Sequence, residues 1–368
     1  MKPKLSILIF LAIAVRLFFI FFQYSGDVKN HFAWADSVIK QGSFGLYQRH
    51  FPGFNDANYP PLTISLFTLS RLAYNTAHRL VLWQNFNFKF LPSVSVRFIE
   101  SENTAAGFMK LPAILADLGT GYLIFKLTKK KLFAFLYLFN PAVIYLSSVW
   151  GQIESLPIFF LLLSFFFLPR RYYLSHLAFV LAVLSKQTAL WLIPVYLIVW
   201  YKRGGAKALL RGLTLQAIVF VLFYFPFTLS LNPFSLYLAT LSGSSTLISN
   251  QAMNLWYFIF QGERLEDSVK LLGVTVRICS LNLLSLSYLY ICVRLWRRFS
   301  IESAANSLFL LSLTAFFLQT RVHERHLAPA LPFLLLATFK PKTKLALYVF
   351  FSVYHLFNLY TGLKLPFV

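Results

Sequence analysis

Apolar stretches long enough to cross a membrane recur from one end of this chain to the other. A helix needs about 20 apolar residues to span a hydrocarbon core of about 30 Å, and hydrophobic residues make up 58% of the sequence. Nine segments are clearly apolar: 5–22, 105–127, 132–150, 153–168, 208–227, 269–293, 304–318, 327–339 and 345–360. We therefore expect an all-α polytopic membrane protein, with a single domain over residues 1–368.

The stretch 174–200 is apolar as well, but basic pairs flank it at 170–171 and 202–203. Basic residues collect on the cytoplasmic side of a membrane, so both pairs belong on one side, and a single crossing would separate them. The pattern favours a hairpin of two short helices that turns at 185–187, around Lys186. The chain then crosses the membrane about eleven times.

The formal net charge of +22 lies in short basic clusters between apolar segments. Such clusters indicate on which side of the membrane each loop lies. They do not form the aromatic-interleaved patch of a nucleic-acid-binding domain, so no nucleic-acid partner is expected. With the N-terminus inside as an uncleaved first span, nearly all carboxylates fall on the non-cytoplasmic face. Two long regions lie there, 23–104 and 228–268, and the first contains an amphipathic stretch, 62–83, that we place along the membrane surface.

Residues that could carry chemistry occur at the outer ends of the spans. Asp27 follows the first span, where a carboxylate could take a proton from an acceptor hydroxyl, although a solvated aspartate at a helix end is the alternative. Tyr59 precedes a stiff diproline, and a tight polar reversal between two apolar runs carries Gln152 and Glu154. Lys186 lies at a depth where a cation needs a partner or a water-filled cavity.

The run from Arg321 onwards places cations on the outer side, against the topology rule. We expect Arg321, His323 and Arg325 to bind an anion, with Glu324 between them, and contact with lipid headgroups is the alternative. No second histidine follows at the spacing of a zinc protease helix. Neither a metal nor another cofactor is expected.

Two further features allow more than one interpretation. Asn254 and Trp256 offer an amide and an indole near the interface, although an interfacial tryptophan belt explains Trp256 almost as well. Asp117 lies inside an apolar run, where an unpaired carboxylate is costly. A structural partner such as Arg16 or Lys110 and a functional role both fit that position.

Taken in order, these motifs resemble those of the GT-C membrane glycosyltransferases, particularly the dolichyl-phosphate-glucose-dependent glucosyltransferases of N-glycan assembly and related prokaryotic mannosyltransferase-like proteins. The resemblance covers nearly the whole chain, and it is carried by residues 26–27, 59–63, 115–118, 150–154, 186–187, 254–256 and 322–325. It implies a GT-C-like first outer loop and an inverting transfer of a hexose from a polyprenyl-phosphate sugar to a glycan or lipid acceptor. Asp27 matches the catalytic base of that loop.

The resemblance also implies roles for the other residues. The lipid phosphate would be held or neutralised by Lys186, Arg321, His323 and Arg325. The pocket for sugar or acceptor would be formed by Tyr59, Gln152, Glu154, Asn254, Trp256 and Glu324. The protein would be surrounded by membrane lipids, in the cell membrane of a prokaryote or the endoplasmic reticulum membrane of a eukaryote.

Two other functional classes compete with the enzyme. A transporter or flippase of lipid-linked sugars needs alternating access and usually contains internal repeats, and the sequence shows no such repeat. A non-catalytic scaffold within a polysaccharide-assembly complex leaves Lys186 and Arg321 unexplained. The identities of the sugar and the acceptor stay open at this point.

Overall fold

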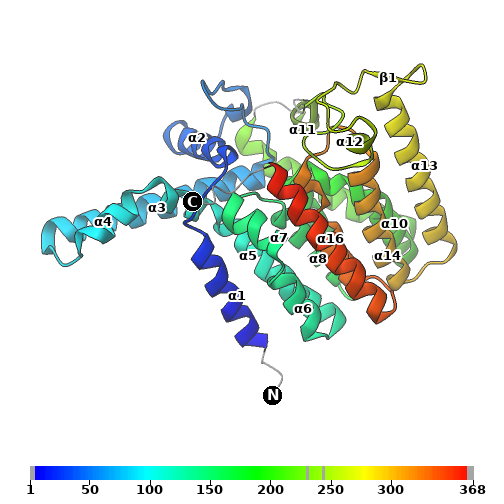
Figure 1. Ribbon diagram of the computed structural model, residues 1–368, viewed down its shortest axis with the longest axis horizontal. Coiled ribbons are helices and arrows are strands. Elements are labelled where there is room, and N and C mark those ends of the chain that lie inside the picture. Colours follow the sequence, from blue (N-terminus) through cyan, green and yellow to red (C-terminus); the bar gives the residue numbers. More distant parts are fainter. Residues whose placement is uncertain (1–4, 229–231, 243–244, 363–368) are drawn as a thin grey trace.

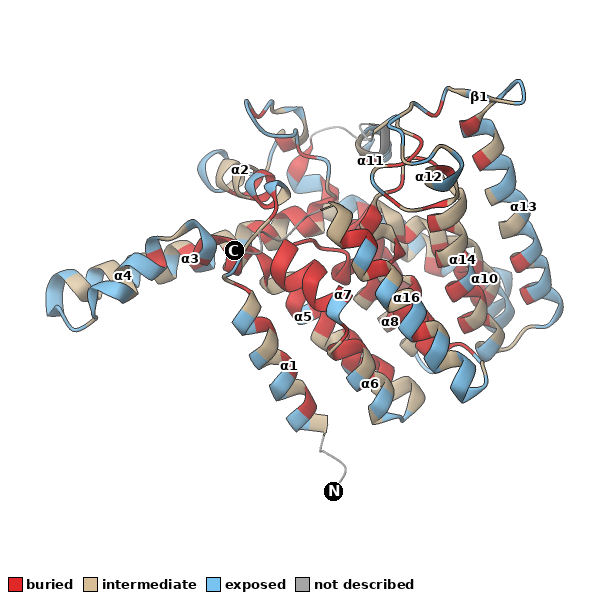
Figure 2. Ribbon diagram, viewed as in Figure 1, coloured by how far each residue is buried: buried red, intermediate tan, exposed pale blue. Residues whose placement is uncertain are grey.

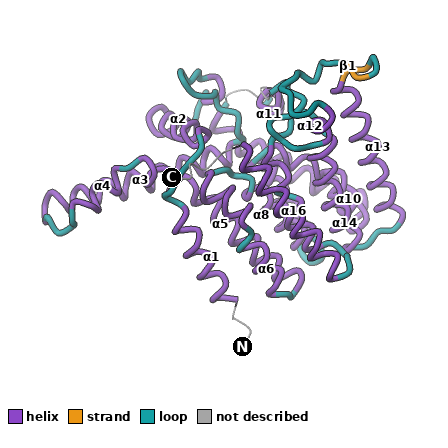
Figure 3. The backbone as a smooth tube through the Cα atoms, viewed as in Figure 1, coloured by secondary structure: helices purple, strands orange, loops and turns teal. Residues whose placement is uncertain are grey.

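The computed structural model describes residues 5–228, 232–242 and 245–362, and within them nearly all regular structure is helical (Figures 1 and 3). The strands found in these ranges are β1 (Lys270–Leu271) and β2 (Val274–Thr275), which pair as a short antiparallel hairpin. The expected all-α fold class is therefore confirmed for the described residues.

The helices follow one another closely along the chain. The first are α1 (Leu5–Phe19), α2 (Gly26–Gln41), η1 (Leu46–Gln48), α3 (Pro61–Phe88) and α4 (Ser93–Glu100). The middle part contains α5 (Glu102–Thr128), α6 (Lys131–Leu138), α7 (Pro141–Ile144), the π-helical η2 (Tyr145–Trp150), α8 (Ser155–Phe167), α9 (Tyr172–Ser185), η3 (Gln187–Leu192), α10 (Ile193–Tyr224) and η4 (Phe225–Phe227). The last part contains α11 (Pro233–Ser242), α12 (Leu255–Ile259), α13 (Val276–Arg297), α14 (Ile301–Leu318), η5 (Glu324–Leu327), α15 (Ala330–Leu336) and α16 (Pro341–Gly362).

Among the described residues, four helices are long and apolar enough to cross a membrane: Glu102–Thr128, Gln187–Phe227, Val276–Arg297 and Ile301–Leu318. A fifth span results if Lys131–Leu138 and Pro141–Trp150, which meet at 47°, count as one broken helix. The chain is thus a helical membrane protein. The predicted number of about eleven spans is wrong by this measure.

The difference arises because local backbone breaks, which an apolar stretch does not reveal, divide the expected spans. The helices α1, α8 and α9 are apolar but contain only 15, 13 and 14 residues. Segment 132–150 is interrupted at Pro141, and segment 327–339 yields the seven-residue α15. Conversely, two expected helices run together as the 41-residue stretch Gln187–Phe227, which bends at Gly205, where φ is 73°.

The hairpin expected around Lys186 is confirmed. Lys186 has an extended backbone (φ −159°, ψ 143°) and separates α9 from η3. The two arms then run antiparallel, because Tyr172 Oη donates to Trp200 O at 3.1 Å and the Phe179 ring packs on Tyr196 at 4.8 Å.

The core of the bundle lies where α5, α8, α9, α10, α14 and α15 pack together (Figure 2). Arg16 of α1 and Asp117 of α5 form a fully buried ion pair at 3.6 Å, so Arg16 is the structural partner that Asp117 needs. Lys110 is not that partner, because its ammonium donates to three backbone carbonyls instead.

The helices α3 and α4 form an arm that extends sideways from the bundle (Figure 1). The helix α3 begins at Pro61, whose fixed φ suits the first helical position, and it includes the predicted amphipathic stretch. Leu80, Trp83 and Phe86 are exposed along its outer half. A helix is thus present over the stretch 62–83, and its outer half exposes apolar side chains.

Candidate functional site

Segments from five parts of the chain meet around one polar cavity of about 560 Å³. They are the first half of α2, the loop before α3, the turn after α9 with η3, the end of α11 with the loop after it, and the segment from the end of α14 into η5. Of the residues proposed from the sequence, the cavity is lined by Asp27, Tyr59, Lys186, Arg321, His323 and Arg325. Residues about 300 positions apart in the sequence thus share one site, as the sequence hypothesis required.

The turn after η2 positions the start of α2. Gly151 adopts a left-handed backbone (φ 85°), and an added Cβ there would lie 2.7 Å from a methyl of Val28. Ser25 N donates to Trp150 O at 3.0 Å, which fixes the chain just before α2. The first turn of α2 therefore lies directly against the polar reversal that follows Gly151.

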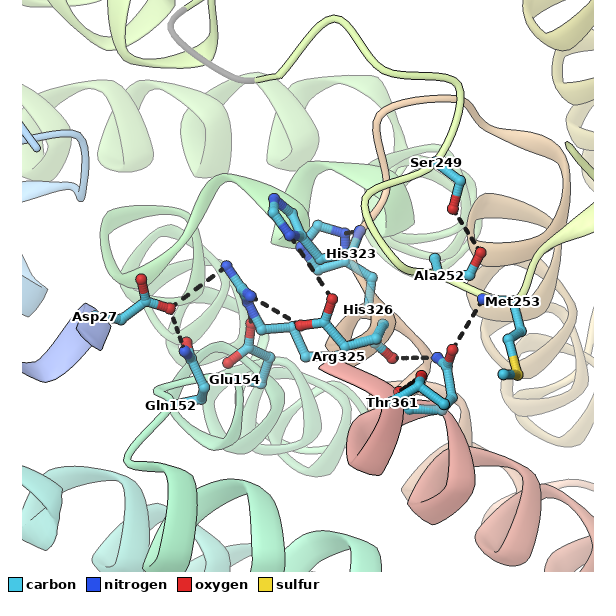
Figure 4. Close-up of polar contacts among 12 residues, drawn as sticks. Asp27, Gln152, Glu154, Ser249, Ala252, Met253, His323, Arg325, His326 and Thr361 are labelled. Carbon is cyan, nitrogen blue, oxygen red and sulfur yellow. Dashed lines mark hydrogen bonds and ion pairs between the residues drawn. The ribbon is translucent and has the colours of Figure 1, made fainter. Parts of the chain in front are cut away.

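Asp27 lies in the first turn of α2, and its side chain is partly exposed to the cavity. Gln152 Nε2 donates to Asp27 Oδ2 at 2.5 Å, and Arg325 Nη2 lies 4.0 Å from the same oxygen (Figure 4). Burial raises the pKa of the Asp27 carboxyl, but the Arg325 guanidinium and the Gln152 hydrogen bond outweigh burial and hold the pKa below its ordinary value. Asp27 is therefore ionised near neutral pH.

Arg325 connects the carboxylates of the site (Figure 4). Its Nε lies 3.1 Å from Glu154 Oε1 and its Nη1 donates to Glu324 Oε1 at 3.0 Å. Lys186 also bonds to Glu154 Oε1, and its ammonium lies 5.2 Å from the centre of the Tyr59 ring. Buried charges are tolerated only when paired, and here each has a partner.

The sequence predicted cations that are free to bind an anion, and these ion pairs change that expectation. Lys186 and Arg325 face the carboxylates of Asp27, Glu154 and Glu324, so their charge is already balanced. Any anionic ligand would have to compete with a carboxylate for these cations. The contact between Arg325 and Asp27 is the longest of the three that Arg325 makes to carboxylates, so it is the easiest to exchange.

His323 and His326, in the run that begins at Arg321, do not supply positive charge. Burial, reinforced by Arg325, lowers the pKa of His323 to about 2, and burial also lowers the pKa of His326 well below its ordinary value. His326 Nδ1 accepts from the His323 backbone N–H at 3.1 Å. His323 therefore lines the cavity as a neutral ring, which brings no charge of its own but can still donate a hydrogen bond to an anion.

Arg321 lines the cavity, but its guanidinium is held by Asp267. Arg321 Nε donates to Asp267 Oδ2 at 2.7 Å and Nη2 donates to Oδ1 at 3.0 Å. Thr320 Oγ1 donates to the same carboxylate at 3.2 Å. The guanidinium is thus partly neutralised by a residue of the second outer region that the sequence analysis did not pair with it.

Asn254 and Trp256 do not line this cavity, so their expected place in the pocket is wrong. The Asn254 side chain accepts from Tyr257 N at 3.0 Å and caps α12. Trp256 Nε1 donates to Leu318 O at 2.8 Å, and its ring is buried. Both residues fasten α12 to the end of α14. The Asn254 amide and the Trp256 indole N–H make their hydrogen bonds within this structural contact.

Aromatic rings that the sequence analysis did not select form one wall of the cavity. His31 stacks on Phe67 at 3.9 Å, and Trp34 and Tyr59 each lie 5.6 Å from the His31 ring. Burial lowers the pKa of His31 to about 3, so this ring is neutral. Asp27, His31 and Trp34 recur at helical spacing, which places them on one face of α2. That spacing is the pattern that could have revealed them.

Several polar atoms at the base of the cluster lack a partner among the described residues. Gln152 Oε1 and Glu154 Oε2 are buried and accept no hydrogen bond there. Neither residue lines the cavity, so these acceptors lie behind its wall. No group of three or more His, Cys, Asp or Glu side chains in the described part of the chain is placed to hold a metal ion.

The arrangement can bind a polar ligand between a carboxylate and an aromatic wall, with cations close by. It offers one ionised carboxylate, Asp27, that opens into the cavity. Comparisons with known proteins add no relative: no family model matches this chain, and no curated protein matches it.

Proposed function

We propose that this protein is a membrane glycosyltransferase of the GT-C type. It transfers a hexose from a polyprenyl-phosphate sugar to a glycan or lipid acceptor on the non-cytoplasmic face of the membrane. The reaction proceeds with inversion at the anomeric carbon, and Asp27 is the catalytic base. The protein resides in the cell membrane if prokaryotic and in the endoplasmic reticulum membrane if eukaryotic.

One observation carries this proposal: Asp27 Oδ2 lies 4.0 Å from Arg325 Nη2, and both residues line one cavity with an aromatic wall. A proton acceptor and a phosphate-binding cation must lie within the length of one sugar for a single displacement. Arg325 and Lys186 also support the proposal, because two cations can stabilise a leaving phosphate, which gains negative charge as its bond to the sugar breaks. The partly exposed ring of Tyr59, against which the buried His31 and Trp34 pack, offers apolar surface to a pyranose ring.

The chemical step uses the groups of this chain as follows. Asp27 accepts the proton of an acceptor hydroxyl while that oxygen bonds to the anomeric carbon. The bond from the anomeric carbon to the phosphate oxygen breaks on the opposite face, and its electron pair stays on the phosphate. Polyprenyl phosphate therefore leaves with one more negative charge, which Arg325 and Lys186 stabilise.

The number of available carboxylates supports the proposed inversion. A retaining enzyme needs a second carboxylate that is free to attack the anomeric carbon. Glu154 is held by both Lys186 and Arg325, and Glu324 is buried against Arg325. Asp27 is thus the carboxylate of this cluster that is open to a substrate.

Binding of the donor also tunes the base. A phosphate that engages Arg325 draws the guanidinium away from Asp27, because that contact is the longest of the three. The pKa of Asp27 then rises from its lowered value, which makes Asp27 a stronger base once the donor is bound. The resting ion pair thereby couples donor binding to activation.

The test compares Asp27→Asn with Asp56→Asn, a variant of an exposed carboxylate in the same outer region. Purified protein is incubated with mannosyl- and glucosyl-phosphate polyprenols and with candidate glycolipids, and mass spectrometry detects the hexose added to the acceptor. Removing the base should lower the rate by about 10²–10⁴-fold, whereas Asp56→Asn should transfer at the wild-type rate. Equal rates for Asp27→Asn and wild type would refute the proposal.

A further inference from the structure

A second polar cavity lies beside the first and shares one of its walls. Its volume is about 450 Å³, and it is lined mainly by the second outer region together with His323 and Thr361. His323 lines both cavities. Figure 4 shows His323 between Asp27 on one side and Ser249 on the other. The two cavities are therefore neighbours, and a molecule that occupies both would pass over the His323 side chain.

We infer that the second cavity binds the oligosaccharide part of the acceptor. This inference rests on the proposed function and narrows its acceptor from a glycan or a lipid to a glycan chain. The reacting hydroxyl lies at Asp27, and the sugars behind it lie along the second cavity.

The chemistry of the lining favours a neutral, hydroxyl-rich ligand. Asn250 and Gln251 carry amides, which both donate and accept hydrogen bonds, as sugar hydroxyls do. Glu263 and Arg264 carry opposite charges, so the lining has no net charge from this pair. Leu247 is the one aliphatic side chain among the lining residues of this cavity, whereas an acyl or prenyl chain would require a continuous aliphatic wall, because burial of apolar surface drives its binding.

An unpartnered buried donor points to a ligand independently. Asn250 Nδ2 is buried and has no hydrogen-bond partner among the described residues. A buried donor without an acceptor costs free energy, so such groups are rare unless a ligand or water completes them. A hydroxyl of a bound sugar would complete this one.

The backbone around Asn250 is held in a defined conformation. Asn250 N donates to Val322 O at 2.9 Å, and Asn250 and Gln251 form β-bridges with His323. Gln251 adopts a left-handed backbone with φ of 60°, which is uncommon outside glycine. Strained residues of this kind gather at ligand sites, where the surrounding contacts maintain them. The amides are thus positioned before a ligand arrives.

The experiment measures transfer to two acceptors, a methyl hexoside and the pentasaccharide of the same hexose. The double substitution Asn250→Ala with Gln251→Ala should raise KM for the pentasaccharide about tenfold or more, because several hydrogen bonds are lost. KM for the donor and for the methyl hexoside should stay unchanged. Lys270→Gln, an exposed residue of β1 just after that region and outside the cavity, is the matched control. An unchanged KM for the pentasaccharide, or an equal rise for both acceptors, would overturn the inference.

A binding measurement separates this inference from the proposed function. Saturation-transfer NMR on Asp27→Asn in nanodiscs should detect the pentasaccharide, and adding the double substitution should abolish the signal. If wild type transfers no hexose but this binding is seen, the proposed function fails and the glycan site stands. If no pentasaccharide binds, the glycan site fails. Asn250→Asp keeps the side-chain shape and removes the amide donor, so it replaces the double variant if that variant does not fold.

Discussion

Arg325 should control the pH at which the protein loses activity in acid. Asp27 acts as a base only when ionised, so activity falls as the pH drops through the Asp27 pKa. The Arg325 charge lies 4.0 Å from Asp27. At that distance two unit charges interact by about 1 kcal/mol in water and about 4 kcal/mol at an effective dielectric constant of 20. These values correspond to roughly 1 to 3 units of pKa.

The exposure of Asp27 decides between these limits. Its side chain is 36% exposed, so solvent screens the interaction and the lower part of the range applies. Arg325→Gln should therefore move the acid limb of the rate profile upward by about 1 to 2 pH units. The wild-type rate should be flat between about pH 5 and 7, because the Asp27 pKa is held below its ordinary value of 3.8.

The assay measures kcat/KM for the donor as a function of pH for wild type, Arg325→Lys and Arg325→Gln, because this parameter reports the free enzyme, in which the ion pair between Arg325 and Asp27 is intact. The lysine variant keeps the charge and should retain most of the wild-type profile. Arg325→Gln leaves buried carboxylates without their partner and costs about 3–5 kcal/mol of stability, so its fold is verified by size-exclusion chromatography. Gln152→Leu, which removes one hydrogen bond to Asp27, should give a smaller shift in the same direction. If the acid limb moves neither in Arg325→Gln nor in Gln152→Leu, the assignment of Asp27 as the titrating base is contradicted.

Two further predictions concern the framework of the site. Gly151→Ala should destabilise the protein by about 1–3 kcal/mol, because its φ of 85° is unfavourable for alanine and the new methyl meets Val28. Thermal unfolding measures this, and Gly26→Ala, where an added Cβ meets nothing within 4 Å, is the control; equal melting temperatures would contradict the packing. Arg16→Met should cost about 3–5 kcal/mol because it leaves Asp117 buried and unpaired. Adding Asp117→Leu should restore much of the loss, and a double variant less stable than Arg16→Met would refute the ion pair.

The sequence pattern identified much of the site because its polar residues stand out against apolar surroundings. Asp27, Gln152, Glu154, Lys186 and Arg325 were each chosen for an unusual position, and the structure brings them together. Burying a charge is costly, so charges in apolar segments tend to find one another. That rule works without knowledge of the fold.

Other features depended on backbone geometry or on the third dimension. Span counting failed at Pro141 and Gly205, where local backbone breaks divide or bend apolar stretches. Asn254 and Trp256 looked functional because they are polar or aromatic near an interface, yet capping and packing use their groups. The pairing of Arg321 with Asp267 joins two outer segments, which the linear order of residues does not disclose.

The most direct test of sugar transfer by one carboxylate is the anomeric configuration of the product. The donor is a β-linked hexosyl phosphate polyprenol labelled with carbon-13 at the anomeric carbon, and NMR reads the configuration of the hexose on the acceptor. Single displacement with Asp27 as base predicts an α-linked product and release of polyprenyl phosphate. A β-linked product, or no transfer from any polyprenyl-phosphate hexose, would contradict the mechanism.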